Sequence, residues 1–313
     1  SLNLSMLRYF FEKSDEDRGY LFKDLAIARD ASCMSHHAQY PVIAMTLKDI
    51  RGNDWSIART KLVDKLSMLF RTFEYICDTL TPEQQNKFDL ICRQKADVAT
   101  YETSLRDLIL WLSAHHGKPV VVLIDEYDSP VIEAWNHHYY DEMIGFMRNW
   151  LGGGLKHEQS AILHRAVITG ILRIAKESIF SGLNNLDVQT TLTPSASSDK
   201  FGFTQDEVDD ILDHFCLGDI SDDLRYWYNG YTFGRHTIYN PWSVVKCVQK
   251  HPAPIGPQWL NTSSNDLVHT ELKAGGLALK RDLEKLLAGE ELRYPITENT
   301  VFSEIDDNAE NIW

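Results

Sequence analysis

The stretch VVVLIDEYDSP, residues 120–130, joins a run of apolar residues to two adjacent acids, Asp125 and Glu126. Residues 120–124 show no alternation with polar residues, which predicts a strand that is covered on both faces, as in the centre of a parallel sheet. Two unpaired acids cannot lie inside such a strand, because burying an unpaired charge is costly. We therefore place Asp125 and Glu126 at the carboxyl end of the strand, where open α/β sheets bind their ligands.

Two further apolar runs extend this predicted sheet. They are PVIAMTL at 41–47 and RAVITG at 165–170. Helical patterns lie between the three runs, among them residues 57–77 and 139–151, and three consecutive glycines at 152–154 predict a turn after the second of these helices. Alternating strands and helices predict an α/β fold in which helices flank a parallel sheet.

The composition changes after the polar, turn-rich segment 190–199. We place a domain boundary there, so that residues 1–199 form the α/β core. Residues 200–290 are predicted to form a smaller, mainly helical domain, for which a winged-helix-like arrangement is one option. Residues 291–313 are interpreted as the start of a linker or of a following domain.

The overall composition is that of a globular protein, with 43% hydrophobic and 24% charged residues in a chain of 313. No segment approaches the roughly 20 consecutive apolar residues of a membrane helix. The net charge of −14 argues against a protein that binds nucleic acid over its whole surface, but it leaves a local basic patch open. Five scattered cysteines favour free thiols in a reducing compartment, so we predict a cytoplasmic protein.

An apolar strand followed by Asp and Glu is the pattern of a Walker B element. In that element the aspartate reaches Mg²⁺ and the glutamate positions the attacking water. A phosphate-binding loop should then lie upstream, yet no such loop precedes residue 120 in the sequence. Taken alone, the segment is equally well interpreted as a pair of solvated carboxylates at the end of a strand, with Asp128 as a turn residue before Pro130.

Several segments together resemble a family, the predicted AAA-ATPase-like family of bacterial P-loop proteins, whose members are often fused to a PD-(D/E)XK nuclease-like domain. They occur in the family's order and span nearly the whole chain, so the resemblance is specific. The matching segments are SLNLSMLRYFFE, VVVLIDEYDSP, ITGILRIAKESIFSGLNNL, FGFTQDEV, WYNGYTFG with IYNPWSV, and WLNTSSNDLV.

The resemblance implies an explanation for the missing loop. In the family, the Walker A loop ends in Gly-Lys-Ser, and a segment like LNLSMLRYFFE follows at once. Ser1 would then be the last residue of that loop, and the chain would be an internal piece of a longer protein. Because the loop supplies most of the phosphate contacts, we predict an ATPase in the full-length protein and an inactive chain as given.

The resemblance also implies roles for individual residues, with ATP and Mg²⁺ as the bound molecules. Ser1 and Asp125 would hold Mg²⁺, and Glu126 would align the attacking water. Thr169 ends the third strand, where related ATPases carry a sensor of the γ-phosphate, and Arg173 would supply positive charge to that phosphate. The alternatives are a Thr169 hydroxyl that stabilises the following turn and an Arg173 side chain in a surface ion pair.

The function we predict is that of a P-loop protein that binds and hydrolyses ATP and couples its nucleotide state to an attached domain. A first alternative is a non-catalytic regulatory or scaffolding module that keeps a relic of the ATPase fold. A second is the ATPase part of a nuclease fusion that processes nucleic acid, which the acidic balance of this chain does not support. The sequence leaves the oligomeric state open.

Two other groups of residues invite functional interpretations. Histidine pairs occur at 36 and 37, at 115 and 116, and at 137 and 138, but no third metal ligand can be identified for any of them. The aromatic residues of WYNGYTFG and IYNPWSV suit either stacking on bases or the packing of a small helical domain. We favour packing.

Overall fold

The computed structural model describes residues 1–156, 161–171, 179, 183, 186–257 and 276–293. The chain divides into two units, Ser1–Asn185 together with Leu267–Trp313, and Leu186–Asp266. Each of the two units has a hydrophobic core of its own. The domain boundaries at residues 199 and 290 stay predictions.

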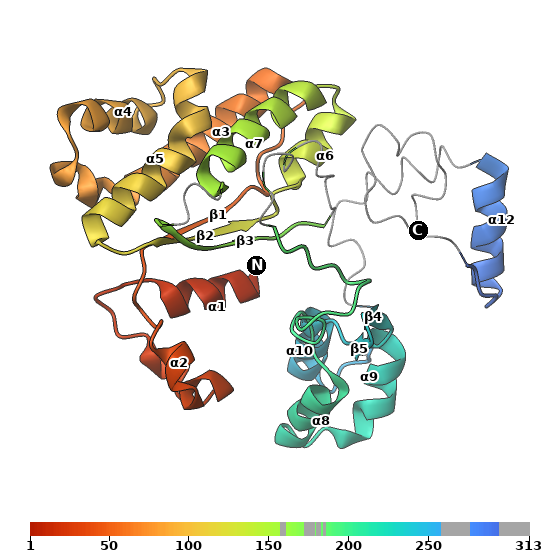
Figure 1. Ribbon diagram of the computed structural model, residues 1–313. Coiled ribbons are helices and arrows are strands. Elements are labelled where there is room, and N and C mark those ends of the chain that lie inside the picture. Colours follow the sequence, from red (N-terminus) through yellow and green to blue (C-terminus); the bar gives the residue numbers. More distant parts are fainter. Residues whose placement is uncertain (157–160, 172–178, 180–182, 184–185, 258–275, 294–313) are drawn as a thin grey trace. The chain divides into compact units, whose positions relative to one another are not determined.

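The first unit is built on a parallel sheet with the strand order β1-β2-β3 (Figure 1). The strands are β1 (Val42–Thr46), β2 (Val120–Asp125) and β3 (Leu163–Ile168). β2 lies in the middle, and its residues 120–124 are all buried, as their unbroken apolar run predicts. All three strands run in the same direction, so their carboxyl ends meet at one edge of the sheet, where Thr46 pairs with Asp125.

Helices cover both faces of this sheet, which confirms the predicted α/β class. Figure 1 shows α3, α5, α6 and α7 over one face and α1 on the other, where Leu4 of α1 packs against Val121 and Leu123. Within its described residues, the helices of this unit are α1 (Leu2–Phe11), α2 (Ala31–Met34), α3 (Trp55–Arg71), α4 (Pro82–Cys92), α5 (Val98–His116), α6 (Ser129–Asn136), α7 (Tyr140–Leu155) and α12 (Gly276–Leu287), with 3₁₀ turns at Gly19–Leu21, Ala26–Arg29 and Glu74–Thr79.

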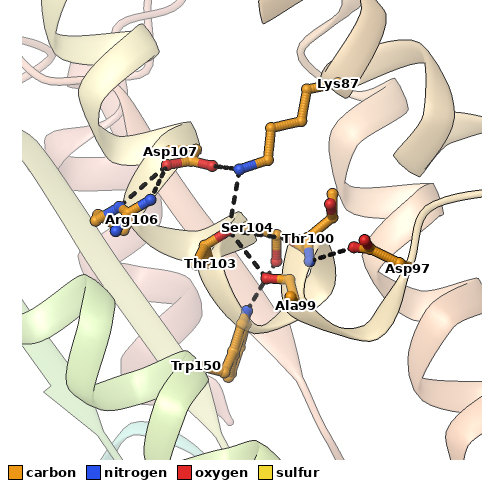
Figure 2. Close-up of polar contacts among 9 residues, drawn as sticks. All are labelled: Lys87, Asp97, Ala99, Thr100, Thr103, Ser104, Arg106, Asp107 and Trp150. Carbon is orange, nitrogen blue, oxygen red and sulfur yellow. Dashed lines mark hydrogen bonds and ion pairs between the residues drawn. The ribbon is translucent and has the colours of Figure 1, made fainter.

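An ionic network around the buried carboxylate of Asp107 joins α4 to α5 (Figure 2). The carboxylate of Asp107 on α5 pairs with the ammonium group of Lys87 on α4 and accepts a hydrogen bond of 2.9 Å from Arg106 Nη2. Lys87 Nζ also donates to Thr103 Oγ1 at 3.0 Å. Asp107 is thus a buried acid whose partners all lie on α4 and α5, which makes it a structural residue of the helical layer.

The turn predicted at glycines 152–154 is wrong, because α7 continues through all three of them. α7 packs closely on α5, where Trp150 Nε1 donates to Ser104 Oγ at 3.1 Å (Figure 2). A Cβ atom added to Gly154 would lie only 2.6 Å from the Cγ atom of Leu105. Close helix packing therefore outweighs the preference of glycine for turns, since this position admits no side chain.

We expect Gly154→Ala to lower the free energy of unfolding by about 1–3 kcal/mol, because the added methyl group overpacks the contact with buried Leu105. Gly153→Ala is the matched control, since a Cβ atom there meets nothing within 4 Å. The control should be neutral or gain up to about 1 kcal/mol from helix propensity. Urea denaturation measures both variants, and equal stabilities would show that the close contact does not require glycine.

The second unit is small and mainly helical, as predicted. Its elements are α8 (Gln205–His214), the 3₁₀ turn Gly218–Ile220, α9 (Ser221–Tyr228), the antiparallel pair β4 (Tyr231–Phe233) and β5 (His236–Ile238), and α10 (Pro241–Lys250). Tyr228 and Tyr239 from the two aromatic segments are buried in its core, beside Leu224. Trp227 and Trp242 are 44% and 49% exposed, so only part of the aromatic cluster packs inside this unit.

Candidate functional site

Backbone hydrogen bonds hold the three segments that follow the strands together at the carboxyl edge of the sheet. The amide of Leu47, just after β1, donates to the carbonyl oxygen of Asp125 at 2.9 Å. On the other side of β2, the amide of Thr169 donates to the carbonyl oxygen of Ile124 at 2.9 Å, and the amide of Tyr127 donates to the carbonyl oxygen of Thr169 at 3.0 Å. The side chains that follow β2 and β3 are therefore held next to each other.

Asp125 lies at the centre of this edge, and its carboxylate accepts hydrogen bonds from two hydroxyl groups. Ser1 Oγ donates to Oδ2 of Asp125 at 2.5 Å, and Thr169 Oγ1 donates to Oδ1 at 2.5 Å. Ser1 precedes the first residue of α1, and Thr169 directly follows β3. Three of the predicted site residues, from segments that are far apart in the sequence, thus meet at one carboxylate.

The hydroxyl groups also lower the pKa of Asp125. Burial by itself raises the pKa of this carboxyl group, but the hydrogen bonds from Ser1 and Thr169, together with the Ser1 amino group, lower the pKa by more. The net result is a pKa below the usual value of an aspartate. Asp125 is therefore ionised at neutral pH and presents a negative charge at the edge of the sheet.

Glu126 follows with an unusual backbone. Its φ is +52°, in the left-handed region that residues with side chains rarely adopt. Ser129 Oγ donates to Oε2 of Glu126 at 3.1 Å, and Lys48 Nζ lies 3.9 Å from Oε1. The Lys48 side chain is 60% exposed, so this ion pair contributes little energy and leaves the carboxylate able to exchange partners.

Asp128, interpreted from the sequence as a turn residue, has a different place. It stands at the N-cap position of α6 and is fully buried. An aspartate at an N-cap usually accepts a hydrogen bond from its own helix, but Asp128 makes no such cap. Its Oδ2 atom instead accepts a hydrogen bond of 2.8 Å from the amide of Ile171, just beyond β3.

Sequence reasoning missed three contributors to the site, namely Asp128, Ser129 and Lys48. For Asp128 and Ser129, the available signal was an Asp-Ser-Pro sequence, which is typical of a helix start and is separated from the two acids by Tyr127 alone. Lys48 had no signal of its own, because only the pairing of β1 with β2 brings it near Glu126. Arg173, the predicted source of positive charge, lies outside the described residues.

The oxygen atoms around Asp125 suit a hard cation. Mg²⁺ prefers oxygen ligands, and the Ser1 hydroxyl and the ionised Asp125 carboxylate supply them side by side. The histidine pairs do not form such a site: within the described ranges, no group of three or more His, Cys, Asp or Glu residues is arranged to hold a metal ion. In the same ranges, no helix combines the length and the apolar character needed to cross a membrane.

The sheet topology and the acids at its carboxyl edge define an α/β protein of the P-loop NTPase type. A family model described as "Predicted AAA-ATPase" matches residues 1–180, and the chain belongs to this family. This result confirms the resemblance of the sequence to that family. Membership suggests an ATP-binding P-loop function.

One curated relative is an uncharacterized protein encoded in the vnfD 5' region of Azotobacter chroococcum mcd 1. It is 30% identical to this chain over 218 residues, which are 69% of the chain and 40% of the relative. The chain thus spans less than half the length of that protein. No solved structure matches the chain. The fusion to a nuclease-like domain and the interpretation of the chain as an internal piece stay predictions.

Proposed function

We propose that this chain carries the Mg²⁺-dependent catalytic site of an ATP-hydrolysing P-loop protein. One observation carries the proposal: the hydroxyl groups of Ser1 and Thr169 meet on the two oxygen atoms of Asp125, at the carboxyl edge of a parallel sheet, with Glu126 as the next residue. The membership in a family of predicted AAA-ATPases supports ATP as the ligand.

In this proposal each residue has a separate task. Ser1 and Asp125 hold Mg²⁺, which when bound offsets the negative charge of the ATP phosphates. Thr169 fixes the second oxygen atom of Asp125 and lies where a γ-phosphate sensor is expected. Glu126 aligns the attacking water through a carboxylate whose present contacts, to Ser129 and Lys48, are exchangeable.

Coupling to an attached domain is the finer part of the proposal. The chain that leaves Thr169 leads, within the same polypeptide, to the unit Leu186–Asp266. Loss of the γ-phosphate would displace Thr169, which lies at the start of the chain segment that leads to this second unit. We keep the cytoplasm as the predicted location, in line with the five cysteines, none of which forms a disulfide.

The test compares the 313-residue chain with a version extended through its native upstream residues, using calorimetry for ATP binding with Mg²⁺ and a phosphate-release assay. We expect binding and hydrolysis in the extended chain and negligible activity in the shorter one, because the loop supplies most phosphate contacts. In the extended chain, Glu126→Gln should lower hydrolysis by about 100-fold or more and leave ATP binding intact.

The matched control is Glu83→Gln, which changes an exposed glutamate at the start of α4 and should leave hydrolysis unchanged. Full hydrolysis in Glu126→Gln would contradict the role of that residue. Equal turnover in the short and extended chains would contradict the need for the upstream loop. If neither chain binds ATP, the scaffolding alternative takes the place of the enzyme.

A further inference from the structure

Asp128 is a buried carboxylate that the proposed catalytic roles leave unused. It belongs to the turn that joins Glu126 to α6, and its side chain is entirely withdrawn from solvent. Its Oδ2 atom accepts a hydrogen bond from the amide of Ile171 instead of capping α6. The carboxylate therefore connects the segment after β2 to the segment after β3.

The fit between these two segments is close. A Cβ atom on Gly170 would lie 2.6 Å from Oδ1 of Asp128 and 2.7 Å from the ring of Tyr127. These distances are too short for any side chain, so the backbone at Gly170 lies directly against Asp128. On the other side of Gly170, the carbonyl oxygen of Thr169 accepts a hydrogen bond from the amide of Tyr127. Hydrogen bonds to residues 127 and 128 therefore hold this segment at Thr169, before the glycine, and at Ile171, after it.

We propose that Asp128 is a positioning residue of the ATP site, which acts by holding residues 169–171 in the place from which the Thr169 hydroxyl reaches Asp125. This inference rests on the proposed function. Asp128 contacts the backbone of residues 169–171, and the Thr169 hydroxyl in this segment donates to the Asp125 carboxylate, which together with Ser1 would hold the metal ion. The effect of Asp128 on hydrolysis therefore passes through Thr169.

The test uses the extended chain and follows kcat and KM for ATP. Asp128→Ala should lower kcat by about 10- to 100-fold with little change in KM, because the sensor segment loses its position while the phosphate-binding loop is untouched. Asp128→Asn keeps an oxygen acceptor for the Ile171 amide and should recover most of the activity. The double variant Asp128→Ala with Thr169→Ala should be no slower than Thr169→Ala alone.

Two further variants separate positioning from folding. Asp107→Asn changes another buried aspartate, whose partners lie on α4 and α5, and should lower the midpoint of thermal unfolding with kcat unchanged. Ile171→Pro removes the backbone N–H that donates to Asp128, at a residue that is 83% exposed, and should reproduce the loss of kcat. This variant keeps the inference testable if Asp128→Ala does not fold.

Specific results would overturn the inference. One is an unchanged kcat in both Asp128→Ala and Ile171→Pro. Another is a loss in Asp128→Ala that multiplies with the loss in Thr169→Ala, because independent effects would mean that Asp128 does not act through Thr169. If Glu126→Gln still abolishes hydrolysis in either case, the proposed function stands without the inference. An extended chain that hydrolyses no ATP would overturn both.

Discussion

Asp125→Asn is expected to lower ATP hydrolysis by the extended chain on the order of 1000-fold and to remove the Mg²⁺ dependence of ATP binding. The substitution keeps the size of the side chain but removes the negative charge that the Ser1 and Thr169 hydroxyls now stabilise. Without that charge, the proposed metal site offers Mg²⁺ only neutral ligands, the Ser1 hydroxyl and an amide oxygen. Mg²⁺ then gains little from this edge of the sheet.

Calorimetric titrations of ATP with Mg²⁺ and with a chelator measure this effect directly. The extended chain without substitutions should bind ATP more tightly with Mg²⁺ than with the chelator, and Asp125→Asn should bind ATP with the same affinity in both conditions. Asp107→Asn serves as the control, because it neutralises a buried aspartate in the helical layer and should keep the difference. A variant at Asp125 that still shows the full Mg²⁺ dependence would sink the proposed ligand set.

Gly170→Ala is expected to affect stability and activity together. The added methyl group would overlap the buried carboxylate of Asp128 and the ring of Tyr127. We expect a loss of about 1–3 kcal/mol in the free energy of unfolding, because both neighbours are buried. Since the displaced segment carries Thr169, hydrolysis should also fall by about 10- to 100-fold.

Gly145→Ala provides the comparison for this variant. Gly145 lies inside α7, and a Cβ atom there meets nothing within 4 Å. The helical position should make alanine neutral or slightly stabilising, with unchanged hydrolysis. Urea denaturation measures the free energy of unfolding of both variants, and the phosphate-release assay measures their ATP hydrolysis. A Gly170→Ala protein as stable and as active as Gly145→Ala would show that the close approach to Asp128 is dispensable.

The sequence predicts the sheet well because its signals are local. The unbroken apolar run at residues 120–124 indicates a central strand, and the acids after it indicate the carboxyl edge. The capping boxes that the structure has at Thr81 and Thr204 are local in the same sense, since each is a threonine followed three residues later by Gln or Glu. Each of these features depends on residues that are neighbours in the chain.

The parts that escaped prediction depend on contacts between distant segments. Glycines 152–154 have the composition of a turn, and the local sequence does not show that α7 packs so closely on Leu105 that Gly154 admits no side chain. Asp128 has the sequence context of a helix cap, but its hydrogen bond goes to Ile171, 43 residues further on. Ser1 and Asp125 were paired through the family resemblance, since no local pattern links residues 124 positions apart.

Under the proposed function, the left-handed backbone of Glu126 exchanges stability for activity. For a residue with a Cβ atom this conformation costs about 1–2 kcal/mol, whereas glycine adopts it freely. A turn selected for stability alone would therefore carry glycine at this position. The chain has a strained glutamate instead, which supports the proposed role of Glu126, because such strain clusters where a protein needs a particular side chain more than a relaxed backbone.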